Sequence, residues 1–118
     1  MFKVIIAGCR DLEDYELVKA YADVKLSKIE DEIEIVSGTA SGADALGERY
    51  AEEKGYRVKR FPADWNKYGR RAGPMRNRQM AEYADALLAY WDGKSRGTKN
   101  MIELAKENGL KVGVKLYE

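Results

Sequence analysis

The sequence predicts a doubly wound α/β fold in which helices cover a five-stranded parallel sheet. Short β-rich runs alternate with segments of helical periodicity, and this order favours parallel strands with helices on both faces. Glycine or proline follows several of these segments, as expected where helices and strands end. With 118 residues, 45% of them hydrophobic, the chain can build one core but not two ordinary domains. Residues 1–118 are therefore predicted to form a single compact, Rossmann-like domain.

The amino-terminal third supplies two strands and one helix. Residues 3–8 contain an apolar run and form the first predicted strand. Residues 14–29 follow as a helix, because apolar side chains recur there at roughly helical spacing. These side chains are Leu17, Ala20, Tyr21, Val24 and Ile29. A second apolar run makes residues 32–37 the next strand.

The middle of the chain supplies a helix, a strand and a long connection. Residues 43–54 form a helix with Gly55 as its C-cap, and residues 56–61 form the third strand, which Pro62 ends. Residues 63–73 show no regular pattern and exceed the usual connection of about four to six residues. This segment is predicted to be an irregular binding loop or lid.

The carboxyl-terminal third completes the alternation. Residues 74–83 form a helix with Pro74 in its first turn, and residues 85–91 form the fourth strand. Residues 98–108 form a helix that Gly109 stops, and residues 110–116 form the last strand.

The composition excludes several kinds of chemistry. The chain has no histidine and one cysteine, so it has no intrachain disulfide, no zinc cage and no Ser-His or Cys-His pair. We expect neither a metal nor a bound cofactor. The net charge of +1 gives no reason to expect nucleic acid or an anionic membrane as a partner. Since the apolar run at residues 4–7 is far too short for a signal peptide or a membrane span, we expect a cytoplasmic protein.

A glycine-containing loop at residues 37–44 joins the second strand to a helix. Glycine permits a tight turn, and the N–H groups at a helix start carry partial positive charge. The loop therefore has the outline of a phosphate-binding loop, with these expected ligand contacts: Gly38, Thr39, Ser41, Gly42 and Asp44. A plain strand-to-helix turn, in which glycine allows close packing, is the alternative interpretation.

A second loop repeats this arrangement after the fourth strand. Residues 92–98 pass from Asp92 through Ser95 and Gly97 to Thr98, where a helix begins. These four residues are predicted to contact the ligand, and Thr98 has the alternative role of a helix N-cap.

Positive charge gathers in the same region of the predicted fold. Residues 64–78 hold five basic side chains against Asp64, and residues 92–99 hold three against Asp92. Ligands of open parallel sheets lie outside the carboxyl ends of the strands, where these segments are expected to meet. Clustered guanidinium groups bind phosphate well. The alternative is a set of solvated loops with local ion pairs.

Four motifs occur in order along the chain. They are Gly-Cys-Arg-Asp at residues 8–11, the loop at 37–44, Ala-Gly-Pro-Met-Arg-Asn-Arg at 72–78 and Ser-Arg-Gly-Thr at 95–98. With these motifs the chain resembles the SLOG superfamily, and within it the small solo SLOG proteins of bacteria and phages. The resemblance covers nearly the whole chain.

The resemblance implies a Rossmann-like sheet with a nucleotide or nucleotide-derived ligand across the strand ends. Gly38, Gly42, Gly97 and Thr98 would then lie near phosphates. The charged contacts would be Arg10, Arg76 and Arg78, and the remaining motif residues of the ligand site are Gly8, Asp11 and Asn77.

The superfamily includes the Lonely Guy phosphoribohydrolases, which release a base from a nucleoside monophosphate with an arginine and a glutamate. Arg78 stands at the position of that arginine, whereas Met101 stands at the position of the glutamate. An enzyme of this kind would have to use Asp44 or Asp92 as the acid, with Arg78 in support. The competing role for Asp44 is stabilising charge at a helix N-terminus.

These observations leave three functional hypotheses. The first is a nucleotide-binding sensor or ligand-processing module. The second is a phosphoribohydrolase-like hydrolase. The third is a single-stranded DNA-binding protein, as in the DNA-processing protein A branch of the superfamily, which the charge of +1 disfavours. The superfamily also suggests a homodimer, through the apolar residues at 75–83 and 101–105.

Overall fold

A five-stranded parallel sheet in the order β3-β2-β1-β4-β5 forms the centre of the protein. The computed structural model describes residues 1–118, with the strands β1 (Phe2–Gly8), β2 (Ile33–Ser37), β3 (Arg57–Arg60), β4 (Ala86–Trp91) and β5 (Lys111–Leu116). β1 pairs with β2 on one side and with β4 on the other, so the strand order reverses at β1. The doubly wound α/β prediction is confirmed.

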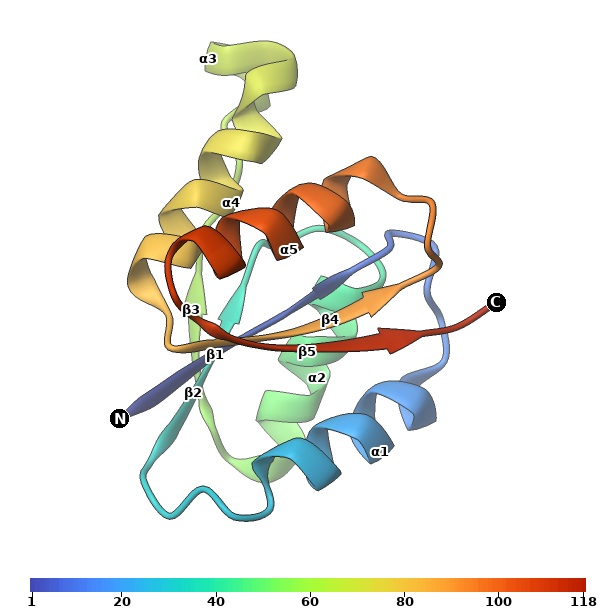
Figure 1. Cartoon of the computed structure of the whole chain (residues 1–118), viewed down its shortest axis with the longest axis vertical. Helices are drawn as coiled ribbons and strands as arrows, with labels where there is room; N and C mark the ends of the chain where they lie inside the picture. The colour runs from blue at the N-terminus through green and yellow to red at the C-terminus, as the bar shows by residue number, and fades with distance from the viewer.

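Helices cover both faces of the sheet. α1 (Tyr15–Leu26) and α2 (Ala43–Lys54) lie on one face, while α4 (Ala72–Tyr83) and α5 (Arg96–Glu107) lie on the other (Figure 1). None of these helices combines the length and apolar character that a membrane-spanning segment requires.

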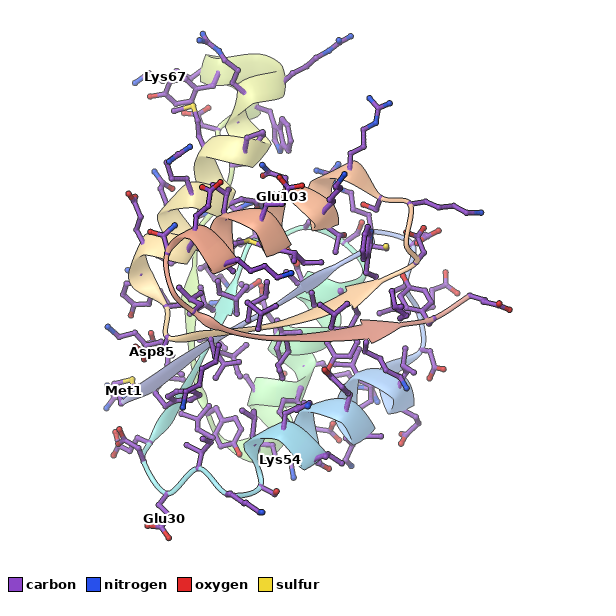
Figure 2. The ribbon with its side chains drawn as sticks, in the orientation of Figure 1. Met1, Glu30, Lys54, Lys67, Asp85 and Glu103 are labelled. Atoms are coloured by element: carbon purple, nitrogen blue, oxygen red, sulfur yellow. The ribbon has the colours of Figure 1, made fainter.

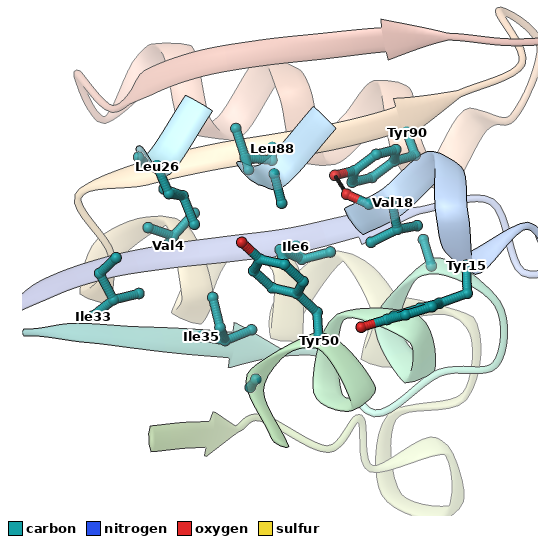
Figure 3. Close-up of a cluster of buried hydrophobic side chains, with 14 of the residues drawn as sticks. Val4, Ile6, Tyr15, Val18, Leu26, Ile33, Ile35, Tyr50, Leu88 and Tyr90 are labelled. Carbon is teal, nitrogen blue, oxygen red and sulfur yellow. Dashed lines mark hydrogen bonds between the residues drawn. The ribbon is translucent and has the colours of Figure 1, made fainter. Parts of the chain in front are cut away.

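Alternating side chains of the strands build one core on each face. In β1, Val4 and Ile6 point toward α1 and α2, whereas Ile5 and Ala7 point toward α4 and α5. Figure 3 shows the first core, in which the Tyr90 hydroxyl donates a hydrogen bond of 2.8 Å to the main-chain oxygen of Val18.

Several helices begin or end two or three residues away from their predicted positions. The helix predicted at 14–29 covers Tyr15–Leu26, because Asp14 is its N-cap and accepts a hydrogen bond from the amide of Leu17. The helix predicted to begin at Thr98 begins at Arg96, and its N-cap is Ser95. Gly55 ends α2 in the left-handed conformation, as predicted.

The segment at residues 63–73 is not the irregular loop that its sequence predicts. It contains α3 (Trp65–Tyr68) and η1 (Gly69–Arg71), which lead directly into α4. The Asp64 side chain caps α3 by accepting from the amide of Lys67 at 3.1 Å. The three helical segments form one column that extends beyond the sheet (Figure 1), and Lys67 lies at its far end (Figure 2).

Candidate functional site

A cavity of about 680 Å³ lies at the carboxyl ends of β1 and β4. It occupies the point where the strand order reverses, which is the usual ligand site of open α/β sheets. Its walls come from the residues after β1, from α4 and from the turn between β4 and α5. The predicted ligand-binding residues that line it are Gly8, Arg10, Asp11, Asp44, Arg76, Asn77, Asp92, Ser95, Gly97 and Thr98. We call it the larger cavity.

A second cavity of about 320 Å³ continues along the same edge of the sheet. It lies beside the segments that follow β2 and β3, and it includes Gly38, Thr39, Ser41 and Ala63. We call it the smaller cavity. Four residues line both cavities, namely Arg10, Ala40, Trp65 and Arg76.

Arg76 reaches the site from α4 and is the most deeply placed cation there. Its side chain is buried, with the residue 8% exposed. Nη1 donates to the main-chain oxygen of Gly38, and Nε donates to Asn77 Oδ1 at 3.0 Å. No carboxylate lies within ion-pair distance, since the ion pairs of the structure involve other residues. Burial lowers the pKa of Arg76, while the charge of Asp44 opposes this shift.

Asp44 lies in the first turn of α2 and faces the same cavity. The residue is 5% exposed, and Oδ2 accepts a hydrogen bond of 3.1 Å from the amide of Ala40. Burial raises the pKa of Asp44 to about 6, although the Ala40 amide and the charge of Arg76 act in the opposite direction. The carboxyl group therefore changes its charge close to neutral pH.

Several donors of the loop at residues 37–44 already have partners within the protein. The amide of Thr39 donates to Ser37 Oγ at 3.1 Å, and the amide of Ala43 donates to the main-chain oxygen of Cys9 at 3.2 Å. Thr39 adopts a positive φ of 64°. These contacts shape the loop, which forms one wall of the smaller cavity.

Gly42 lies against the segment after β1 and lines neither cavity. Its φ is +74°, and a Cβ at this position would lie 2.3 Å from the main-chain oxygen of Cys9. The Ser41 hydroxyl also donates to the main-chain oxygen of Arg10 at 3.1 Å. Gly42 therefore allows two of the predicted motifs to pack together.

The start of α5 presents open main-chain donors to the larger cavity. Ser95 Oγ accepts from the amide of Thr98 at 3.4 Å, but the amides of Arg96 and Gly97 have no partner within the protein. Nothing lies within 4 Å of the Cβ position of Gly97. A helix N-terminus with free amides favours an anion.

Asp92 and Asn77 hold this helix start in place. Asp92 Oδ1 accepts from the amides of Ser95 at 2.9 Å and Lys94 at 2.8 Å, and these bonds lower the pKa of Asp92. Asn77 Nδ2 donates to Asn100 Oδ1 at 3.0 Å, which links α4 to α5. Both side chains line the larger cavity, and both also have this structural role.

Arg78 is exposed and lines neither cavity. It follows Arg76 by two positions on α4, so the two side chains leave the helix in nearly opposite directions, at about 100° per residue.

Gly8 packs closely against β4, because a Cβ there would lie 2.2 Å from the main-chain oxygen of Tyr90.

Trp65 and Asn100 line the site, although neither was among the predicted ligand contacts. Trp65 lines both cavities, with its ring beside Gly73 and beneath the Arg10 guanidinium, whose carbon is 5.3 Å from the ring centroid. Asn100 lines the larger cavity. Its place three residues after Gly97 puts it on the same helix face, which is the signal that could have revealed it.

Comparison with known proteins identifies the family. The sequence profile of the SLOG family described as YspA, cpYpsA-related matches residues 2–68. Gene 61 protein of Mycobacterium phage D29 is 34% identical over 119 aligned positions, which cover 95% of this chain and 94% of the phage protein.

The fold is similar to that of DNA processing protein A from Streptococcus pneumoniae. The TM-score is 0.74 at 22% sequence identity, over 97% of this chain. The match covers 50% of the length of the DNA processing protein, so the likeness concerns the fold of that half. Because the family profile matches more than half of the sequence, the chain belongs to the YspA, cpYpsA-related SLOG family (YAcAr).

Proposed function

We propose that this protein binds a nucleotide or a nucleotide-derived phosphorylated ligand in the larger cavity. The buried guanidinium of Arg76 is the observation that carries the proposal. A buried charge is normally paired, yet Arg76 has no carboxylate within ion-pair distance. The carboxyl group that acts on Arg76 is that of Asp44. Burial raises the pKa of Asp44 to about 6, so a negative charge on this carboxyl group is itself costly. A phosphate would supply the missing anion.

The start of α5 supports the same ligand chemistry. The free amides of Arg96 and Gly97 belong to the wall of the larger cavity. Together with Arg76 on α4, they offer main-chain donors and a guanidinium to a phosphate, and both groups favour that ligand. Polar side chains of the lining, among them Asp11, Asn77 and Asn100, can further bind the hydroxyl groups of a ribose.

A sensor or ligand-processing module fits this site best. Met101 lines the larger cavity and is buried, so the helix position that would carry an acid in the phosphoribohydrolases is apolar here. Hydrolysis of the bound nucleotide is the second candidate function, because Asp44 is a buried carboxyl group with a pKa of about 6 in the same cavity. Such a pKa suits a general acid at neutral pH.

The test is calorimetric titration with AMP, ADP-ribose, NAD and cyclic dinucleotides. At least one should bind, and Arg76→Gln should weaken its binding at least tenfold, which corresponds to about 1.4 kcal/mol. Arg78→Ala is the matched control, because it removes a guanidinium from the same helix outside the cavity, and it should change the affinity less than twofold. Thermal denaturation would verify that each variant is folded.

Two outcomes would contradict the proposal. One is the absence of binding by every phosphorylated compound at millimolar concentration. The other is equal loss of affinity in both arginine variants. Chromatography of each nucleotide after incubation distinguishes the second candidate function, since release of a free base by the wild type and not by Asp44→Asn would establish hydrolysis.

A further inference from the structure

We infer that the ligand has two parts joined through a diphosphate, with a nucleoside in the larger cavity and a second sugar or nucleoside in the smaller one. This inference rests on the proposed function and deepens it by naming the class of ligand. It is carried by the arrangement of the two cavities and by the side chains between them.

The two cavities form one continuous binding edge. The larger lies at the ends of β1 and β4, and the smaller lies beside the segments that follow β2 and β3. These four strands are neighbours in the sheet order. The volumes of about 680 and 320 Å³ each fall within the range of about 300–1,000 Å³ that small-molecule sites occupy. A mononucleotide in the larger cavity would therefore leave the smaller cavity empty.

The smaller cavity has the chemistry of a sugar site. Its lining includes the hydroxyl-bearing residues Thr39 and Ser41 and the aromatic ring of Trp65. Thr39 makes no side-chain hydrogen bond within the protein, so its hydroxyl is available to a ligand. Trp65 is 47% exposed, and a partly exposed ring offers a flat face to a sugar or a base. Hydroxyl-rich groups suit this lining better than an apolar chain does.

Two guanidinium groups stand where the cavities meet. Arg10 and Arg76 line both cavities, and neither forms an ion pair within the protein. Arg76 is held by Gly38 and Asn77, whereas Arg10 is exposed and stacks on Trp65. Two cations at one junction match the two negative charges of a diphosphate bridge. The second part of the ligand would then reach the smaller cavity past Arg10.

The experiment compares AMP with ADP-ribose, which share one nucleoside and differ by a phosphate and a ribose. The wild type should bind ADP-ribose at least tenfold more tightly. Ala63→Phe should abolish this difference and leave the affinity for AMP within twofold, because Ala63 lines only the smaller cavity. Thr39→Gly is a second variant that removes the hydroxyl and keeps the positive φ, and it should weaken ADP-ribose selectively.

The outcomes separate this inference from the proposed function. Equal affinities of the wild type for AMP and ADP-ribose would overturn the inference and leave nucleotide binding intact. Equal weakening of both compounds by Ala63→Phe, with the fold preserved in thermal denaturation, would also overturn it. If the wild type bound neither compound nor any other phosphorylated probe, the proposed function would fail and the inference with it.

Discussion

The Arg76 guanidinium donates a hydrogen bond to the main-chain oxygen of Gly38, although the two residues are 38 positions apart in the chain. This bond ties α4, on one face of the sheet, to the loop between β2 and α2. It brings a buried cation to the wall that both cavities share. Two motifs that are separate in the sequence thus form one site.

Replacement of Gly38 by alanine should disturb this contact directly. The φ of Gly38 is not positive, so the backbone tolerates alanine, but a Cβ there would lie 2.7 Å from both Arg76 Nη1 and Asp44 Oδ2. We expect a loss of about 1–3 kcal/mol in the free energy of unfolding and weaker nucleotide binding. Urea denaturation and calorimetry measure the two effects, and unchanged stability would show that the arginine moves aside at no cost.

Gly97→Ala should have the opposite effect on stability but should also weaken binding. Nothing lies within 4 Å of its Cβ position, and alanine favours a helix over glycine by up to about 1 kcal/mol. We therefore expect equal or greater stability. Because Gly97 lines the larger cavity beside the free amides of α5, the added methyl should weaken nucleotide binding several-fold. A variant with full affinity would place the phosphate away from this helix start.

The sequence was sufficient to predict the order of strands and main helices because the pattern is repeated and local. Apolar runs and helical periodicity come from neighbouring residues, and the parallel direction of the strands follows from the βαβα order. The prediction of an irregular loop at residues 63–73 was wrong because it also depended on local periodicity. The short helix α3 ends at Gly69, with φ of +55°, and helical turns as short as α3 and η1 produce no detectable period.

The site was predictable at the level of motifs but not of individual side chains. Arg76 and Arg78 belong to one basic motif, and only the rotation of α4 against the sheet decides which of them enters the cavity. The contact of Gly42 with Cys9 likewise depends on where the segment after β1 passes.

The homodimer stays a prediction. Most apolar residues suggested for it pack on the sheet, including Met80 and Met101, whereas Met75 is exposed.

Two buried tyrosines offer a matched test of the first core. The Tyr90 hydroxyl donates to the main-chain oxygen of Val18 at 2.8 Å (Figure 3), whereas the buried Tyr15 hydroxyl has no partner. Tyr90→Phe should therefore cost about 1 kcal/mol. Tyr15→Phe should be neutral or stabilising, since it removes an unsatisfied polar group. Urea denaturation of both variants measures the difference, and equal losses would contradict this account.

Asp44 should make the stability of the protein depend on pH. In the unfolded chain its pKa is near 3.8, whereas burial raises the folded value to about 6. Between these two pH values the folded state holds a proton that the unfolded state has released. The contribution of Asp44 to stability should therefore fall as the pH rises from about 4 to about 6 and change no further above that range. The shift of about two units corresponds to roughly 3 kcal/mol.

Asp44→Asn isolates this contribution, because the asparagine side chain cannot ionise and its oxygen can still accept from the Ala40 amide. The variant should equal the wild type near pH 4 and exceed it in stability at pH 7. Other carboxylates titrate in both proteins, so the difference between the two unfolding curves reports Asp44 alone. A difference that stays constant from pH 4 to pH 7 would mean that Arg76 and Arg10, which lower this pKa, compensate for burial completely.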